Sequence, residues 1–396
     1  MKIIVLLLGL LSAFGPLSID MYLPAFPLIA EEFNTDLSNI QLSLSSFLVG
    51  IALGQIFYGP LTDRFGRKKP LYAGLIIYCL ASIFCALSIN AEQLIYLRLF
   101  QALGSCAGMV ISRAVVRDLY RPQDAAKVFS LLMLIMGVAP ILAPVAGGVV
   151  SSLFGWRAIF WILSIISGLS FILMFFFLKE THEEVVPLNT QTIFKNYGLI
   201  IRDRSFIANA LGLAFTNAGM FSYITGSSFV FVEHFGVGPT TFAWIFGLNA
   251  AGIIGASQLN GLLLSRFKAN SILQSVLIYG AFAGLLLFTA GNVNPPMIVI
   301  CLGLFLYLPT MGIVGPNASA LALSNQKKLA GSASALLGTV QFTISGMMSA
   351  LVSTFHDGTI RPMCTMIFIC ATLAFLSHYF FRPRSTRTEE IALSHS

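Results

Sequence analysis

Apolar residues along this chain gather in long, nearly unbroken stretches instead of alternating with polar ones. Each stretch approaches the roughly 20 residues that a helix needs to cross a bilayer. Twelve such stretches occur, in two sets of six. The predicted spans are 4–29, 39–60, 71–90, 93–115, 127–150, 157–178, 206–232, 240–264, 271–290, 297–322, 330–354 and 361–381. The pattern predicts an all-α membrane protein of twelve transmembrane helices.

The composition favours the same class. Of 396 residues, 57% are hydrophobic and 10% are charged, whereas an ordinary soluble protein has about 25% charged residues. Such a chain cannot cover a soluble fold with polar surface. The six cysteines all fall in apolar stretches without metal-ligand spacing, and we interpret them as small buried hydrophobic residues. We expect no metal site.

The placement of the basic residues predicts the topology. Nineteen Lys and Arg fall in loops on the side of the termini, and two, Arg157 and Arg361, fall on the opposite side. Short loops rich in Lys and Arg stay in the cytoplasm, so both termini are expected there. The net charge of +7 therefore reflects topology and not nucleic-acid binding. The first apolar run is too long for a signal peptide, and we interpret it as the first span.

One polar stretch divides the spans. Residues 179–205 hold eight charged residues, and we interpret them as a cytoplasmic linker between an N-terminal half, 1–178, and a C-terminal half, 206–381. Residues 382–396 are expected to form a cytoplasmic tail. Within the linker, Thr192–Arg202 is apolar enough to lie on the membrane as an amphipathic segment.

The two halves show a weak internal repeat. The second span ends in the sequence Gly59–Phe65, and the eighth ends in Gly261–Phe267, each with the pattern G-x-x-x-x-R-F. Both copies fall at the same point of their half. This agrees with two halves related by a parallel repeat, as in many secondary transporters.

Asp20 is the acidic residue that stands out, because it lies inside the first span while the fifteen other acids fall in loops or near span ends. A carboxylate in hydrocarbon is costly unless it is paired, protonated or in contact with water, so it marks an ion or proton site by default. The alternative is an acid near the outer interface, since Pro24 could end the helix early.

Arg98 is the matching cation in the fourth span, about 8 Å from the outer end at the rise of an α-helix. Asp20 and Arg98 are expected at similar depth, either as an ion pair or as two charges that share one aqueous cavity. A snorkelling arginine is the alternative. Arg113 lies nearer the cytoplasmic end, where it can reach headgroups or contribute to a substrate site.

Two further segments indicate conformational roles. The loop 59–69 contains turn-forming and charged residues, among them Gly59, Asp63, Arg64, Gly66 and Arg67. In the fifth span, prolines that remove backbone hydrogen bonds alternate with glycines that allow close helix approach. The residues of interest there are Gly137, Pro140, Pro144, Gly147 and Gly148.

These motifs resemble those of the major facilitator superfamily. The 59–69 loop is similar to the family's loop between spans two and three, and the stretch from Arg98 to Gly108 is similar to its span-four motif. The 137–148 segment resembles the span-five motif of antiporters. Asp20 to Pro24 resembles the span-one motif of drug:proton antiporters, particularly the bicyclomycin-resistance (Bcr/CflA) family.

The resemblance implies a mechanism. Asp20 would bind the exchanged proton, and Arg98 would adjust how tightly that proton is bound. Asp63, Arg64 and Arg67 would hold the inward-closed gate. Two positions depart from the family. Ala143 stands where the span-five motif usually has glycine, and Ser265 stands in the second-half loop where the first has an aspartate, which weakens any gate contact there.

A substrate cavity would be lined from both halves. The candidate contacts are Met21, Tyr22, Arg113, Asn217, Phe221, Tyr223 and Asn249. We expect a monomeric exporter of small amphipathic compounds in a bacterial inner membrane, driven by the proton gradient and without a cofactor. The alternative cargo is an endogenous metabolite or siderophore.

Other classes are disfavoured by the motifs. An intramembrane enzyme would need HExxH, GxSxG or a pair of intramembrane aspartates, and none occurs. An ATPase would need a GxxxxGK[ST] loop, which is also absent. A receptor that does not transport remains open at this stage.

Overall fold

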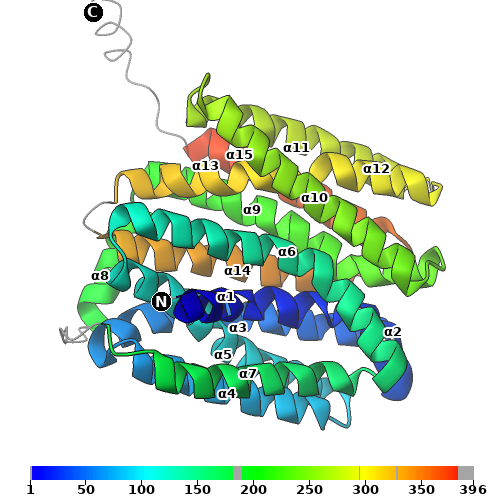
Figure 1. Ribbon diagram of the computed structural model, residues 1–396. Helices are drawn as coiled ribbons and strands as arrows, with labels where there is room; N and C mark the ends of the chain where they lie inside the picture. Colours follow the sequence, from blue (N-terminus) through cyan, green and yellow to red (C-terminus); the bar gives the residue numbers. More distant parts are fainter. Residues whose placement is uncertain (1, 182–189, 294, 327–328, 382–396) are drawn as a thin grey trace, which may run out of the picture.

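A computed structural model describes residues 2–181, 190–293, 295–326 and 329–381 (Figure 1). Within these ranges every regular element is helical. In the first part of the chain they are α1 (Lys2–Asp20), η1 (Leu23–Ala25), α2 (Phe26–Glu32), α3 (Leu37–Phe65), α4 (Lys68–Ala86), α5 (Ala91–Leu119), α6 (Pro122–Phe154) and α7 (Arg157–Phe177). In the second part they are α8 (Thr190–Ile201), α9 (Arg204–Ser227), η2 (Ser228–His234), α10 (Pro239–Leu264), α11 (Ala269–Gly291), α12 (Met297–Tyr307), α13 (Thr310–Ser324), α14 (Ala330–Thr354) and α15 (Arg361–Phe381). The predicted all-α membrane fold is confirmed.

Eleven helical segments of the described chain are long and apolar enough to cross a membrane. The remaining predicted span, 206–232, which is the seventh along the chain, coincides with α9 and the π-helical η2. This helix is more polar, with Asn209, Thr216 and Asn217 buried along it. It can be polar because it packs against α13, α14 and α15 instead of facing lipid. A long apolar stretch in the sequence therefore identifies helices that face lipid more reliably than a helix such as α9, which is enclosed by other helices.

The helices form two bundles that lie side by side in Figure 1. Helices α1 to α7 pack with one another in one bundle and α9 to α15 in the other, which lies mostly above the first in Figure 1, with α14 drawn between α6 and α1. Contacts between the bundles come mainly from α3 against α14 and from α6 against α10. The short α8 packs on α9 and α14 at the end of the bundles where α1 begins. It covers most of the predicted amphipathic segment.

Small residues allow the helices of the first bundle to approach closely. A methyl group on Gly50 of α3 would lie 2.5 Å from the carbonyl oxygen of Leu99 in α5. One on Gly104 of α5 would lie 2.5 Å from the backbone nitrogen of Tyr78 in α4. Lipid gives no hydrophobic drive for helix association, so such close van der Waals packing holds the helices together.

Two of the predicted spans are interrupted. The first consists of α1, η1 and α2, and it breaks directly after Asp20. Pro24 has no N–H to donate to the Asp20 carbonyl four residues earlier, which ends α1 at that residue. The tenth span consists of α12 and α13, with the break at Leu308 and Pro309.

A polar contact fixes the outer piece of the first span. The Glu32 carboxylate at the end of α2 accepts a 2.6 Å hydrogen bond from Trp156 Nε1 and an ion-paired hydrogen bond from Arg157. Arg157 also donates to the Ser88 carbonyl at 3.0 Å. The segment after the break is therefore anchored to α7 and to the loop between α4 and α5.

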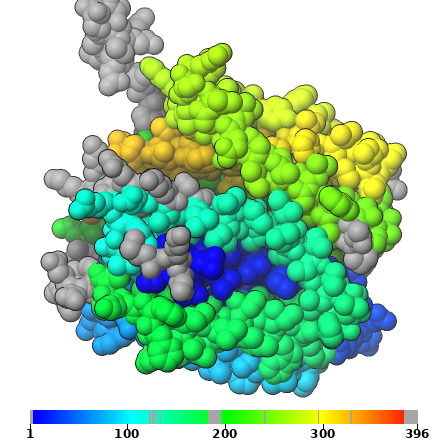
Figure 2. Space-filling view, in the orientation of Figure 1, coloured from blue at the N-terminus to red at the C-terminus, as the bar shows by residue number. Residues whose placement is uncertain are grey.

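On the face seen in Figure 2, α1 is visible in a groove between α6 and α7. Leu6 of α1 is 65% exposed there. The opposite face of α1, with Leu8, Leu11 and Phe14, is buried in the bundle. One helix thus contacts both the lipid-facing surface and, at Asp20, the centre of the molecule.

Candidate functional site

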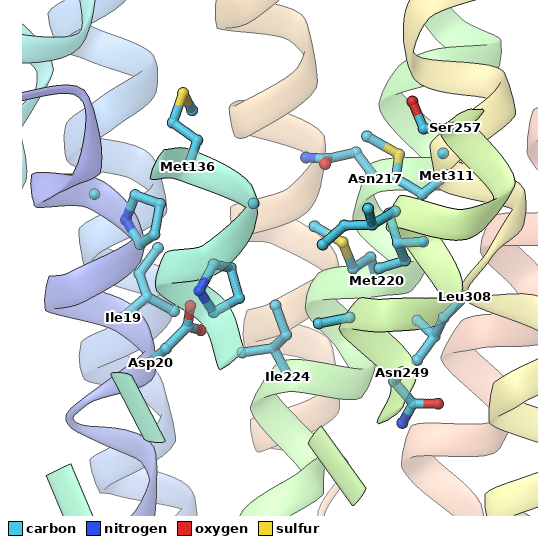
Figure 3. A pocket seen from close by; sticks show the side chains of 18 of the residues that line it. Ile19, Asp20, Met136, Asn217, Met220, Ile224, Asn249, Ser257, Leu308 and Met311 are labelled. Carbon is cyan, nitrogen blue, oxygen red and sulfur yellow. The ribbon is translucent and has the colours of Figure 1, made fainter. Parts of the chain in front are cut away.

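A cavity of about 950 Å³ lies between the two bundles (Figure 3). Its walls come from α1, α3, α5 and α6 on one side and from α9, α10, α13 and α14 on the other, with Leu308 just before α13. Most of the wall is apolar, and much of it is flexible thioether or aromatic. The methionine and phenylalanine side chains are Met109, Met136, Met220, Met311, Phe129, Phe221, Phe246 and Phe342.

The cavity extends along two of the long helices that line it, α6 and α10. Its lining on α6 extends from Phe129 to Pro140, and its lining on α10 extends from Phe246 to Gln258. The first residues of α6 and the last residues of α10 lie at the end of the bundles that carries α8 and the basic loops, so the lining extends toward that end. Asp20 lies at the opposite, deep end of this lining.

Asp20 is the one charged side chain among the described residues that line the cavity. It is 3% exposed, and no group of the described chain donates a hydrogen bond to its carboxylate. Figure 3 shows Asp20 on one side of the cavity, with Ile224 and Asn249 on other helices across from it. An acceptor in an apolar wall without a donor is suited to bind a proton or a cationic group.

The structure also addresses the alternative that Asp20 lies at the outer interface. The helix does end early, as Pro24 predicts, but the chain continues through η1 and α2 to Glu32. Asp20 is therefore at a break inside the first span and not at its outer end.

Arg98 is fully buried, and it neither pairs with Asp20 nor lines the cavity. One amino group donates to the Gln101 side chain at 2.5 Å, and the other donates to the Ser18 carbonyl at 2.9 Å. Both arrangements considered from the sequence, an ion pair with Asp20 and a shared cavity, are absent in the described chain. Arg98 is also too deeply buried to snorkel.

Aromatic rings surround the Arg98 guanidinium. Its central carbon lies 4.2 Å from the ring centroid of Phe47, 4.8 Å from Tyr22 and 5.9 Å from Phe160. A cation over an aromatic face is stabilised by the ring quadrupole, most strongly where water is excluded. Rings and amide oxygens, not a carboxylate, therefore support this charge.

Sequence reasoning missed the polar residues that connect Arg98 to α1. Gln101 donates to Ser82 Oγ at 2.7 Å, and the hydroxyls of Tyr78 and Ser18 lie 2.6 Å apart. The spacing of Arg98 and Gln101, three residues apart on one helix face, was the available signal. The network joins α5, α4 and the last turn of α1.

The loop 59–69 forms a charged network around Arg67. Its guanidinium donates to Asp63 at 2.8 Å, to Thr62 Oγ1 at 2.9 Å and to Asp118 at the end of α5 at 2.9 Å. Burial disfavours the charge of Arg67, but the hydrogen bonds to Asp118 and Asp63 outweigh it and hold the Arg67 pKa above its usual value. The predicted loop residues Asp63 and Arg67 are thus brought together, with Asp118 as a partner that was not predicted.

Glu180, three residues after the end of α7, caps the start of α4. Its carboxylate accepts from the backbone N–H groups of Arg67 at 2.7 Å and Lys68 at 3.1 Å. Gly66 has φ +77°, and a methyl group there would lie 2.5 Å from the Glu180 carboxylate.

The two other predicted residues of this loop take no part in the network. Arg64 is exposed, and its guanidinium lies over the Phe65 ring. A methyl group on Gly59 would meet open space.

The predicted residues of the fifth span lie along α6. Pro140 lines the cavity, and Gly137 both lines it and faces Ile254 of α10. Pro144 and Gly148 are buried. A methyl group on Gly147 would overlap the backbone carbonyl of Met21, directly after Asp20.

The structure separates the candidate substrate contacts into two groups. Asn217, Phe221, Tyr223 and Asn249 line the cavity. Met21, Tyr22 and Arg113 do not: the first two are buried in the first bundle, and Arg113 has an exposed side chain on α5.

Comparisons with known proteins give the following similarities. The profile described as Major Facilitator Superfamily matches residues 8–350. An uncharacterized MFS-type transporter of Bacillus subtilis, YdgK, is 38% identical over 377 residues, 94% of each chain. A bicyclomycin resistance protein homolog of Haemophilus influenzae is 30% identical over 388 residues, 98% of each chain. The multidrug resistance protein MdtL of Escherichia coli is 27% identical over 368 residues, 93% of each chain.

Solved structures share the fold at low sequence identity. A D-xylose–proton symporter superposes with a TM-score of 0.72 and 16% identity, over 95% of this chain and 97% of that one. An inward-facing, unoccupied bacterial homolog of the human lysosomal transporter Spinster gives 0.72 and 16%, over 97% of this chain and 99% of that one. These similarities support the arrangement of the helices described above.

Proposed function

The chain belongs to the major facilitator superfamily, and from that premise we propose that it exports small amphipathic compounds in exchange for protons. It is a multi-pass membrane transporter and not an enzyme. The exporter proposal agrees with the names of two relatives, a bicyclomycin resistance protein homolog and a multidrug resistance protein.

One observation carries the proton coupling: the Asp20 carboxylate lies in the wall of an apolar cavity without a hydrogen-bond donor. An ionised carboxylate in that position has a high free energy when no partner contacts it. Binding a proton or a donor group of the cargo lowers that free energy. Proton and cargo then compete for one site. Competition of this kind is what an antiporter requires, since each ligand must displace the other.

Export is the direction that we propose, and the placement of the cavity supports loading of the cargo from the cytoplasm. Its lining extends toward the end with the basic loops, which the positive-inside rule puts in the cytoplasm together with both termini. Cargo would enter from there and leave on the other side after the halves, 1–178 and 206–381, rock about the cavity. The linker 179–205 would stay cytoplasmic, and the tail 382–396 lies outside the described residues. The transporter would act as a monomer in a bacterial inner membrane.

Arg98 has a supporting role in this scheme. It does not touch Asp20, but it fixes the carbonyl of Ser18 in the last turn before it. The charge network around Arg67 would hold the cytoplasmic ends of α3, α4 and α5 as one rigid unit during the rocking. The proton gradient alone would supply the energy, without a cofactor.

The test is proton release from purified protein in detergent on addition of bicyclomycin and a panel of other antibiotics. Release by wild type and its loss in Asp20→Asn is the expected result. Asp36→Asn, at an exposed acid outside the cavity, should release protons as wild type does. Equal release by wild type and Asp20→Asn would remove Asp20 from the coupling role.

The same cavity would also accept an endogenous metabolite or siderophore of similar size and polarity. Metabolite profiling of the growth medium, with the transporter present or deleted, separates the two cargoes. A compound that accumulates outside only when the transporter is present, without any change in antibiotic sensitivity, would assign the export to the cell's own metabolism.

A further inference from the structure

Tyr223 lines the same cavity as Asp20, from the opposite bundle. It lies on α9, lines the cavity and is 3% exposed. Its ring stacks on Phe246 of α10, with centroids 5.5 Å apart and an interplanar angle of 26°. This stacking holds the ring, so the position of its hydroxyl group is defined by packing.

The Tyr223 hydroxyl has a proton without an acceptor. It accepts a 3.2 Å hydrogen bond from Asn249 Nδ2, which leaves its own O–H free to donate. No group in the described chain accepts that hydrogen bond. A buried donor of this kind needs a partner from the cavity.

Asp20 is the complementary group. It is an acceptor without a donor, on α1 of the first bundle, in the wall of the same cavity. Asp20 and Asn249, the residue that donates to the Tyr223 hydroxyl, both line this cavity, on opposite sides of it in Figure 3. The two groups belong to the two bundles that would move relative to each other.

We propose that Tyr223 is a positioning residue for the proton site: as the two halves close over the cavity, its hydroxyl donates to the ionised Asp20 carboxylate, with Asn249 fixing its orientation. This rests on the proposed proton coupling. A hydrogen bond to a charged acceptor is roughly twice as strong as one between neutral groups. The contact therefore favours the ionised form of Asp20 and links its protonation to the relative position of the bundles.

Asn249 strengthens this donor. A hydroxyl that accepts a hydrogen bond becomes a better donor itself, because chained hydrogen bonds polarise one another. The three groups would form a chain from α10 through α9 to α1. Cargo that places a donor or a cation against Asp20 would replace Tyr223 in this chain.

The experiment titrates Asp20 directly in the purified full-length protein. The infrared C=O band of its protonated carboxyl group is identified as the band that Asp20→Asn removes. Tyr223→Phe deletes the hydroxyl and keeps the ring on Phe246. If the hydroxyl stabilises the ionised form, the variant binds the proton more tightly, and the titration midpoint moves about one unit to higher pH, about tenfold in proton affinity.

Two further variants make the result decisive. Asn249→Ala should shift the midpoint in the same direction by a smaller amount. Tyr307→Phe removes another buried hydroxyl of the second bundle, which has no partner in the described chain and does not line the cavity, and it should leave the midpoint unchanged. An unchanged midpoint in Tyr223→Phe, or an equal shift in Tyr307→Phe, would overturn the proposal. If Tyr223→Phe does not fold, an unchanged midpoint in Asn249→Ala has the same meaning.

The proposal and the function on which it rests fail in different ways. If the antibiotics release no protons while Asp20 still titrates, the exchange of drug for proton fails. If wild type releases protons but Tyr223→Phe titrates as wild type does, only the role of Tyr223 fails.

Discussion

Arg98 donates a 2.9 Å hydrogen bond to the backbone carbonyl of Ser18, two residues before Asp20. A fully buried guanidinium on α5 thus fixes the last turn of the helix that ends at the candidate proton site. Arg98 thus contacts the segment that ends at Asp20 through its backbone and does not contact the Asp20 carboxylate. Substitutions that keep the charge but change its shape should therefore affect transport.

Arg98→Lys tests this geometry. An ammonium group is a compact point charge and cannot donate in the two directions that the planar guanidinium serves. Losing one charge-assisted hydrogen bond should lower transport by at least about tenfold, although the charge is retained. Drug-driven proton flux in proteoliposomes measures the effect. Arg117→Lys, at an exposed position of the same helix, is the matched control, and flux in Arg98→Lys equal to that control would refute the geometric role.

Gly147→Ala tests the contact between α6 and the break after Asp20. The added methyl group would overlap the Met21 carbonyl, so α6 must move away or the break must shift. Overpacking of this kind costs about 1–3 kcal/mol, which thermal unfolding in detergent would register as a lower melting temperature. Gly255→Ala on α10 has open space at the same atom and should melt at or above the wild-type temperature. Equal melting of the two variants would contradict the close contact.

Gly66→Ala tests the turn between α3 and α4. At φ +77° an alanine is strained, and its methyl group would displace the Glu180 carboxylate from the start of α4. The expected loss of stability is at least about 1 kcal/mol, measured by thermal unfolding. Gly261→Ala, with open space in the second bundle, is the control. A Gly66→Ala protein as stable as this control would show that Glu180 is not needed there.

The sequence predicts the number and approximate limits of the spans, because the bilayer thickness sets the length of each apolar stretch. It also points to Asp20 and to the residues of the loop that contains Arg67. Depth in the membrane follows from position along a helix. For this reason Asp20 and Arg98 were expected at similar depth.

Rotation about the helix axis is not predictable in the same way. Arg98 turns into the bundle and Asp20 turns into the cavity, but helices that are apolar on all sides carry no polar face to reveal this. Met21 and Tyr22 follow Asp20 directly, yet the break turns both away from the cavity. Partners from distant helices, such as Asp118 for Arg67, depend on the assembled fold.

Ser349→Ala tests a contact between the bundles away from the cavity. The Ser349 hydroxyl on α14 lies 2.8 Å from that of Ser45 on α3 and 2.7 Å from that of Thr225 on α9. All three are buried on the side opposite to α8. Because interhelical hydrogen bonds in membranes contribute about 0.6 kcal/mol on average, the variant should raise the population open on that side by about threefold.

Spin labels at Asp36 and Asp357, exposed residues of the first and second bundles on that side, report the opening through their distance distribution. A larger share of long distances in Ser349→Ala is expected. Ser353→Ala is the matched control, since its buried hydroxyl donates only within α14, and it should give the wild-type distribution. If Ser349→Ala does so as well, this contact between the bundles has no part in keeping that side closed.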